Sequence, residues 1–410
     1  MDIFLGAKNA SREFSSVGSN KKDELLMKIS ELIDKQRKFI LTENAKDIDY
    51  AVKNSLKESL LDRLLLNEKR IDSMINGVME IQKQDDPVGS IEMGTTRPNG
   101  LIIEKIRVPL GVVGIIYESR PNVTVDAAAL CIKSGNVCIL RGGKEAVHSN
   151  LALGKIIKDA IISANLNEYI VNVVEDPNRE FLNKMLKAKG FVDLIIPRGG
   201  ESLISYVTEH SLIPVIKHDK GVCHVYIDNF ALKDMAINIA LNAKVSRPGV
   251  CNAMETLLVH HAVANEFLTE MVEIYHNNSV ELVGCKRAQK FNHVKPATED
   301  DWYTEYLSLK LSIKVVDSLY EAIDHINKYG SGHSEAIVTE NYSNAMEFLK
   351  RVDAAAVYVN ASTRFTDGGE FGLGAEVGIS TQKLHCRGPM GVKDLTTTKY
   401  IIFGNGQVRV

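Results

Sequence analysis

The chain has 410 residues, of which 45% are hydrophobic and 25% charged, a composition typical of a globular protein with roughly two to three domains. Its net charge of −3 provides no overall field that would attract nucleic acid or an anionic membrane. No apolar run approaches the roughly 18 residues of a membrane span, and the first residues lack the basic start of a signal peptide, so we expect a cytoplasmic protein.

Residues 1–90 predict helices, because apolar side chains recur three and four positions apart. Pro87 and Gly89 end this pattern. Two extended runs follow at 101–108 and 111–117, and they predict a hairpin that leads into a buried central strand.

From residue 120 to 230, strand-like runs alternate with helix-like stretches. The strand-like runs lie at 137–140, 170–174, 192–196, 214–216 and 223–227. Repeated strand–helix units predict a mostly parallel sheet covered by helices, whose ligands bind at the carboxyl ends of the strands. A second series at 232–359 has strand-like runs at 256–259, 314–316, 335–339 and 355–359. The sequence therefore predicts an α/β fold with two parallel sheets.

Cys251 follows the turn-forming pair Pro248 and Gly249 and precedes a strand-like run. A thiol on a tight turn beside a strand is held rigidly and exposed, as a nucleophile must be. A lone cysteine is more often a small buried apolar residue, so both interpretations stay open at this point. The six cysteines and the histidines show no spacing typical of metal ligands, so the sequence predicts no metal site.

Asn122 follows the run 111–117, directly after Arg120 and Pro121. A fixed side-chain amide at the carboxyl end of a strand can donate to a developing oxyanion. An asparagine that stabilises the turn after a proline is the more common alternative.

Two glycine-containing turns carry cations directly after strand-like runs. Arg141 and Lys144 flank a glycine pair, and Arg198 precedes Gly199. Such turns suit a phosphate or a ribose phosphate, although neither is a dinucleotide fingerprint or a Walker loop. Each turn alone could be a solvated loop, but two turns in one sheet favour a nucleotide.

Several long stretches resemble the gamma-glutamyl phosphate reductase family, which belongs to the aldehyde dehydrogenase superfamily. They are 107–122 (RVPLGVVGIIYESRPN), 246–256 (SRPGVCNAMET), 322–335 (AIDHINKYGSGHSE), 359–376 (VNASTRFTDGGEFGLGAE) and 385–391 (HCRGPMG). These motifs are specific to the reductases, and they cover the chain in order from about residue 100 to its end.

The resemblance implies an aldehyde-dehydrogenase-like fold of two Rossmann-type domains with a small β element for oligomerisation. An NADPH-binding domain would comprise residues 1–92 and 111–225. Residues 226–389 would form the catalytic domain, and 93–110 with 390–410 the oligomerisation strands. We therefore expect a homo-oligomer, and an association with glutamate 5-kinase stays open.

The resemblance also implies roles for individual residues. Cys251 matches the nucleophile, Asn122 the oxyanion-binding amide, and Arg141 and Glu305 the groups that hold the two ribose rings of the cofactor. Lys144, Arg198 and Gly199 are further candidates for binding NADPH. The candidates for binding the phosphate and carboxylate of the substrate are the arginines inside the matched stretches: Arg120, Arg247, Arg364 and Arg387.

The implied reaction is the NADPH-dependent reduction of L-glutamyl 5-phosphate to L-glutamate 5-semialdehyde with release of phosphate, the second step of proline synthesis from glutamate. It would proceed through a cysteine thioester. Hydrolytic superfamily members carry a glutamate base for water, and Lys217 and His218 stand where that glutamate is expected. The alternatives are a hydrolytic or CoA-acylating dehydrogenase and a non-catalytic protein of the same fold, and the last predicts loss of Cys251 or Asn122.

Overall fold

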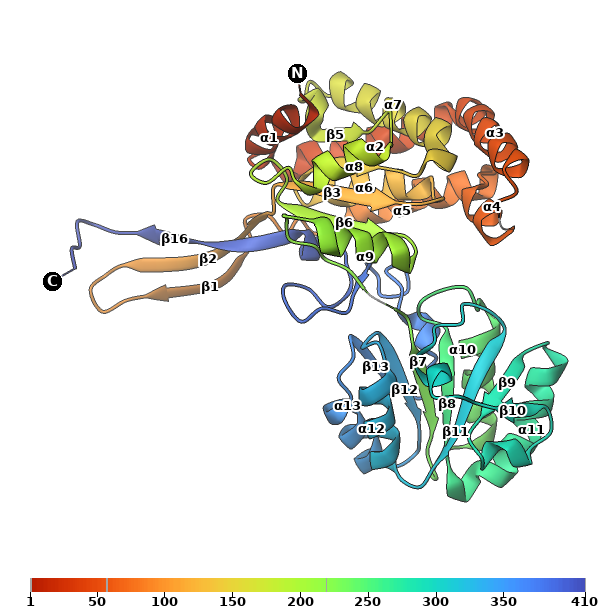
Figure 1. The fold of residues 1–410 in the computed structure, drawn as a ribbon. Helices are drawn as coiled ribbons and strands as arrows, with labels where there is room; N and C mark the ends of the chain where they lie inside the picture. The colour runs from red at the N-terminus through yellow and green to blue at the C-terminus, as the bar shows by residue number, and fades with distance from the viewer. Residues whose placement is uncertain (1, 57, 219, 410) are drawn as a thin grey trace. The chain divides into compact units, whose positions relative to one another are not determined.

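The computed structural model describes residues 2–56, 58–218 and 220–409, and the chain forms two compact units (Figure 1). Unit 1 consists of Met1–Lys217, Gly372–Gly378 and Pro389–Val410, and unit 2 consists of His218–Phe371 and Ile379–Gly388. Each unit contains a parallel sheet, as the sequence predicts. None of the described helices is long and apolar enough to cross a membrane.

Unit 1 begins with helices, as the periodicity of residues 1–90 predicts. They are α1 (Ile3–Phe14), α2 (Ser19–Lys35), α3 (Arg37–Lys53), α4 (Glu58–Leu64) and α5 (Glu68–Lys83). In α2 the periodic residues Leu25, Leu26, Ile29 and Ile33 are all buried. The apolar stripe of this helix thus faces the core, which is why the spacing of three and four predicts it correctly.

The sheet of unit 1 has four parallel strands in the order β5-β4-β3-β6. The strands are β3 (Val112–Tyr117), β4 (Val137–Arg141), β5 (Val171–Val173) and β6 (Leu194–Arg198). The helices between and after them are α6 (Asn122–Lys133), α7 (Val147–Ser163), α8 (Arg179–Leu186) and α9 (Glu201–His210). The predicted strand at 214–216 forms only an isolated bridge between Val215 and Ile195.

The sheet of unit 2 has seven strands in the order β10-β9-β11-β8-β7-β12-β13. They are β7 (Cys223–Ile227), β8 (Met254–His260), β9 (Glu281–Gly284), β10 (Val294–Pro296), β11 (Lys310–Val316), β12 (Ser334–Val338) and β13 (Ala356–Val359). Its helices are α10 (Lys233–Val245), α11 (His261–Asn277), α12 (Leu319–Tyr329) and α13 (Tyr342–Arg351). The expectation that 223–227 continues the first sheet is wrong, because β7 lies between β8 and β12.

That difference moves the division between the units. Unit 2 begins at His218, before β7, whereas the boundary expected from the sequence lies at residue 225. All five residues of β7 are buried, so its continuous apolar run fits a central strand of either sheet equally well. The hydrophobic pattern therefore could not assign this strand to its sheet.

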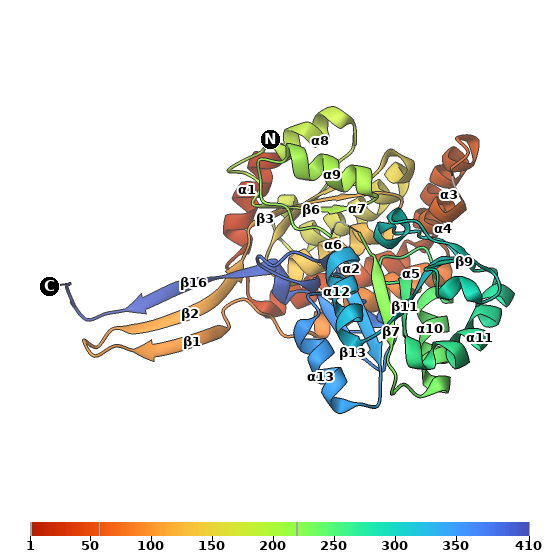
Figure 2. The ribbon, with the colours of Figure 1, turned by 60° about the horizontal axis from the view of Figure 1, so that its bottom comes forward.

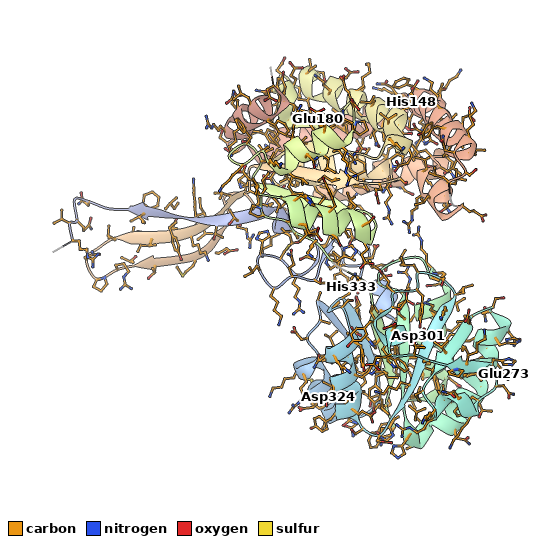
Figure 3. The ribbon with its side chains drawn as sticks, in the orientation of Figure 1. His148, Glu180, Glu273, Asp301, Asp324 and His333 are labelled. Carbon is orange, nitrogen blue, oxygen red and sulfur yellow. The ribbon has the colours of Figure 1, made fainter. Side chains whose placement is uncertain are left out.

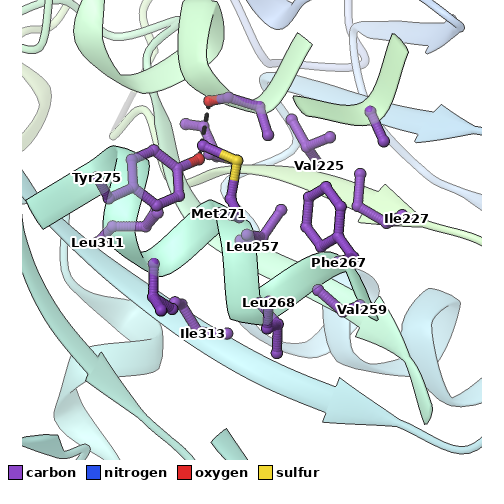
Figure 4. Close-up of a cluster of buried hydrophobic side chains, with 14 of the residues drawn as sticks. Val225, Ile227, Leu257, Val259, Phe267, Leu268, Met271, Tyr275, Leu311 and Ile313 are labelled. Atoms are coloured by element: carbon purple, nitrogen blue, oxygen red, sulfur yellow. Dashed lines mark hydrogen bonds between the residues drawn. The ribbon is translucent and has the colours of Figure 1, made fainter. Parts of the chain in front are cut away.

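One hydrophobic core cluster of unit 2 is formed where α10 and α11 cover the sheet (Figure 4), and a second one contains residues of α12 and α13. Phe267, Leu268 and Met271 of α11 pack against strand residues such as Leu257. Burial of each large apolar side chain contributes about 1.5–3 kcal/mol. Tyr275 joins this core, and its hydroxyl donates to the carbonyl of Ala240 at 2.9 Å, so its polar atom is satisfied.

Three strands of unit 1 form an antiparallel arm in the order β1-β2-β16 (Figure 2). They are β1 (Ile91–Thr96), β2 (Ile102–Pro109) and β16 (Thr396–Phe403). The predicted hairpin between 101–108 and 111–117 is wrong, since β2 pairs with β1 and β3 enters the parallel sheet. Pro109 ends β2, and Gly111 has a φ of +124°, so the chain changes direction between the two runs.

Candidate active site

Cys251 lies in the turn of unit 2 that joins α10 to β8, at the amino end of the parallel strands. Its side chain is half-buried. The turn packs directly on Gly221, where a Cβ atom would lie only 2.0 Å from the carbonyl oxygen of Cys251. No larger residue fits at position 221, so the backbone of Cys251 packs tightly against Gly221.

Asn252 ties this turn to the segment that follows β13. Its side-chain amide donates to the carbonyl oxygens of Thr366 at 2.8 Å and Arg364 at 3.3 Å. The backbone carbonyl of Asn252 accepts a hydrogen bond from the hydroxyl of Thr363 at 2.7 Å. The buried Asn252 thus fixes the residue next to the thiol. The sequence does not predict this role, and its one signal is the position of Asn252 inside the stretch 246–256.

Arg364 supplies positive charge at this turn. Its guanidinium donates to the Asn252 side-chain oxygen and to the hydroxyl of Ser246, the latter at 3.2 Å. Burial and the charge of Arg247 lower the pKa of Arg364, whereas the negative charges of Asp367 and Cys251 raise it. That interaction is reciprocal, so the guanidinium favours the thiolate form of Cys251.

Cys223, at the start of β7, is a second thiol beside the turn. Its Sγ donates to the carbonyl of Cys251 at 3.2 Å and lies 3.8 Å from Nδ1 of His333, which is labelled in Figure 3. Burial raises the pKa of Cys223 well above its ordinary value. Cys223 is therefore a protonated donor that supports the turn, and Cys251 is the more exposed of the two thiols.

Glu305 lies in the loop before β11, and a buried ion pair holds this loop next to the Cys251 turn. The Nζ of Lys244 lies 2.5 Å from Oε2 of Glu255, and both side chains are fully buried. The other oxygen of Glu255 accepts the backbone N–H of Leu307 at 3.2 Å. Leu307 packs against Gly249 of the Cys251 turn, because a Cβ atom at Gly249 would lie 3.7 Å from the carbonyl oxygen of Leu307.

Removing one partner of such a pair would leave an uncompensated buried charge, at a cost of about 3–5 kcal/mol. Burial raises the pKa of Glu255 to about 7 and lowers that of Lys244. The charge of Glu305 acts on both groups. The structure therefore brings Glu305 close to the ion pair that supports the Cys251 turn.

Arg387 contacts Asp353, which lies outside the Cys251 turn. Its Nη1 lies 2.8 Å from a carboxylate oxygen of Asp353, and its Nη2 donates to the carbonyl of that residue at 3.2 Å. Lys383 pairs with the same carboxylate at 2.5 Å. These contacts lower the pKa of Asp353 and give Arg387 a local structural partner. Arg387 thus differs from Arg364 in that its partner lies outside the Cys251 turn.

In unit 1, Asn122 is the first residue of α6 and is exposed beyond the carboxyl end of β3. Its Nδ2 donates to Oδ2 of Asp126, one helical turn further on, at 2.9 Å. The half-buried Arg120 precedes it in the same connection, and its carbonyl accepts the N–H of Val123 at 3.0 Å. The position of Asn122 at this edge agrees with the expectation from the strand pattern.

Arg141 ends β4, and its guanidinium donates to the carbonyl of Pro177. Burial lowers the pKa of Arg141, whereas the charges of Glu145 and Glu118 raise it. Lys144 is exposed at the start of the short helical turn that follows. Lys144 is therefore the more exposed of the two cations in this turn, whereas Arg141 makes a structural contact with Pro177.

Arg198 ends β6 and lies with its Nη2 3.5 Å from Oε1 of Glu376. A Cβ at Gly199 would approach Oε2 of Glu118 to 2.4 Å, and the same oxygen accepts the N–H of Gly200 at 2.9 Å. This packing explains why glycine stands at 199 without reference to a ligand. It leaves the backbone of the turn close to the carboxyl edge of the sheet, where a dinucleotide would lie.

The structure thus groups the predicted residues into two sets. At the carboxyl edge of the unit 1 sheet lie Arg120, Asn122, Arg141, Lys144, Arg198 and Gly199. Around the Cys251 turn of unit 2 lie Arg247, Arg364 and Glu305. No group of three or more His, Cys, Asp or Glu among the described residues is arranged to hold a metal ion.

Comparison with known proteins agrees with the family resemblance of the sequence motifs. The sequence matches the aldehyde dehydrogenase family over residues 2–282 and 310–400. It is 53% identical over 408 residues to a gamma-glutamyl phosphate reductase from Nautilia profundicola, covering 100% of this chain and 99% of the relative.

Two solved structures extend this comparison. The crystal structure of gamma-glutamyl phosphate reductase from Thermotoga maritima has a TM-score of 0.97 at 46% identity, covering 100% of this chain and 99% of that one. A glyceraldehyde-3-phosphate dehydrogenase from Methanocaldococcus jannaschii, solved in complex with NADP, has a TM-score of 0.71 at 17% identity. It covers 98% of this chain and 94% of its own, and at this identity it supports the fold alone.

Proposed function

Because the chain belongs to the aldehyde dehydrogenase family and, within it, to the gamma-glutamyl phosphate reductases, we propose that it reduces L-glutamyl 5-phosphate to L-glutamate 5-semialdehyde with NADPH and releases phosphate. This is the second step of proline synthesis from glutamate. The observation that carries the proposal is the half-buried Cys251 on a clamped turn beside a guanidinium.

The first chemical step is nucleophilic attack by the Cys251 thiolate. A bond forms between Sγ and the acyl carbon of the substrate, and the bond from that carbon to the phosphate oxygen breaks. The leaving electron pair goes to phosphate, which needs little protonation because it is a good leaving group. Arg364 and the exposed Arg247 are the cations of this turn that suit an anionic leaving group. The product of the step is a thioester on Cys251.

Asn122 supports the second step. Reduction of the thioester turns its carbonyl oxygen into an oxyanion, and an amide N–H aimed at that atom stabilises it. The exposed Nδ2 of Asn122 has two N–H bonds, of which the hydrogen bond to Asp126 uses one. Collapse of the tetrahedral species then returns the electron pair to sulfur and releases the semialdehyde.

The carboxyl edge of the unit 1 sheet fits a phosphorylated dinucleotide in the chemistry of its donors. Lys144 is exposed there, and Arg141 and Arg198 end the strands β4 and β6 at the same edge. Bound NADPH would supply the hydride for the reduction. The cations would hold its phosphates, and Glu305 would accept hydrogen bonds from its nicotinamide ribose.

Replacing Lys144 by Ala should raise the KM for NADPH roughly 10-fold while changing that for NADH little, because a charge-assisted hydrogen bond to the 2′-phosphate contributes about 1.5–3 kcal/mol and NADH lacks this phosphate. Steady-state kinetics with both cofactors measures the effect. Lys155→Ala is a matched control, since Lys155 is exposed on α7 and pairs with Asp159. Equal changes in the two KM values would assign Lys144 no contact with the phosphate.

The arm supports assembly with further copies of the chain. Its strands expose large apolar side chains, with exposed fractions of 60% for Ile402, 58% for Tyr400 and 59% for Ile91. Exposed apolar clusters of this kind are typical of protein–protein contacts. We therefore place the oligomer contact on the arm.

Ile402→Glu should shift the protein toward the monomer, because a buried unpaired carboxylate opposes association. Sedimentation velocity measures the change. Thr397→Glu, at an exposed polar position of the same strand, is the control. An unchanged assembly of Ile402→Glu would show that the contact lies elsewhere.

The reverse reaction tests the function directly. Glutamate semialdehyde and NADP should yield NADPH beyond one equivalent per active site in a spectrophotometric assay only when phosphate or arsenate is present. Phosphate attacks the thioester in this direction, and the chain has no glutamate where hydrolytic relatives activate water. Oxidation that is equally fast without phosphate would instead indicate a hydrolytic dehydrogenase.

A further inference from the structure

We propose that Asp126 positions the Asn122 amide for oxyanion binding, an inference that rests on the proposed function. The two residues lie four apart on α6, and the Nδ2 of Asn122 donates to Oδ2 of Asp126 at 2.9 Å. The Asn122 side chain is exposed, whereas Asp126, whose carboxylate accepts this hydrogen bond, is half-buried.

An exposed asparagine needs such a partner to act as a fixed donor. Its terminal torsion is broad and nearly two-fold, so the amide can present either its oxygen or its nitrogen to a ligand. An ionised carboxylate accepts hydrogen bonds only, and it therefore selects the orientation in which the NH₂ group faces it. The second N–H of the same nitrogen can then donate to an oxyanion.

The surroundings of Asp126 support this single role. Its other oxygen, Oδ1, faces α5 at Gly77, where a Cβ atom would be 4.0 Å away. The charge of Arg198 favours the carboxylate, and the charge of Glu376 opposes it. Since Arg198 pairs with Glu376, the carboxylate is left to orient Asn122.

Protonation should weaken the effect. Burial raises the pKa of Asp126 to about 6, with the amide bond and Arg198 acting in the opposite direction. A protonated carboxyl can donate to the amide oxygen, which permits the reversed orientation. The contribution of Asp126 should thus be full above this pKa and should disappear as the pH falls below it.

The test is a double-mutant cycle with Asp126→Asn and Asn122→Ala, measured as kcat and KM in the forward and reverse directions. Asp126→Asn should lower kcat by roughly 10-fold near pH 8, where Asp126 is ionised, with little change in either KM. In the Asn122→Ala background the same substitution should have no further effect, because a residue that acts through Asn122 loses its role with that side chain. The ratio of wild-type to Asp126→Asn kcat should approach 1 below about pH 6, where Asp126 becomes protonated.

The outcomes separate this inference from the proposed function. If Asn122→Ala is slow but Asp126→Asn retains the wild-type kcat, or if the two losses multiply, the positioning role is overturned. A ratio that does not vary with pH overturns it as well. If Asn122→Ala itself leaves kcat unchanged, the oxyanion role in the proposed function fails instead. Thermal unfolding of each variant shows that the fold is intact.

Discussion

Cys251→Ala should abolish reduction of the acyl phosphate, with a loss in kcat on the order of 10⁶, as is found when a covalent nucleophile is removed. The thiol supplies the bond that replaces phosphate, and the buried neighbour Cys223 cannot replace it. Burial raises the pKa of Cys223 and keeps it protonated, and its Sγ is occupied by the carbonyl of Cys251. Equilibrium binding of NADPH and the melting temperature should stay close to those of the wild type.

Cys223→Ser is the matched control for this prediction, since a hydroxyl can still donate to the Cys251 carbonyl. Serine at the remaining cysteines should also be tolerated: Cys131, Cys138, Cys285 and Cys386, none of which lies in the Cys251 turn. Iodoacetamide should inactivate the enzyme in proportion to alkylation of Cys251, measured by mass spectrometry. Inactivation that follows labelling of a different cysteine would contradict the assignment.

Asn122→Ala should lower kcat by about 10²–10³, the usual loss for one oxyanion-hole donor. The amide is exposed at the start of α6, so its removal leaves no cavity in the core. Binding of NADPH should therefore hardly change. Single-turnover reduction with excess enzyme measures the chemical step. A parallel loss in cofactor affinity would make Asn122 a structural residue of the turn.

The sequence predicts the elements of this fold well where pattern and environment agree. The apolar spacing of Leu25, Leu26, Ile29 and Ile33 matches a buried helix face, and the apolar runs of β3 and β4 are fully or almost fully buried. The turn that carries Cys251 follows from Pro248 and Gly249, which local chemistry alone places between a helix and a strand.

The sheet to which a strand belongs is less predictable. β7 is as apolar as the strands before it, and only its long-range pairing with β8 and β12 places it in unit 2. The hairpin partner of β2 was assigned wrongly for the same reason, because two extended runs adjacent in sequence need not pair.

The supporting contacts of the site depend on residues distant in sequence. Asn252 acts through Thr363 and Thr366, more than a hundred positions away. Asp126 gains its role from the orientation of one amide. No local pattern encodes such contacts, so the sequence indicates the reacting groups more readily than the groups that hold them.

The most direct test of the account is detection of the acyl enzyme. Incubation with glutamate semialdehyde and NADP in the absence of phosphate should leave a glutamyl thioester on Cys251, because no acceptor removes the acyl group. Peptide mass spectrometry should locate this adduct on the peptide that contains Cys251, and addition of phosphate should discharge it. Reduction of NADP to NADPH with no adduct on Cys251, or with the adduct on another residue, would contradict the proposed mechanism.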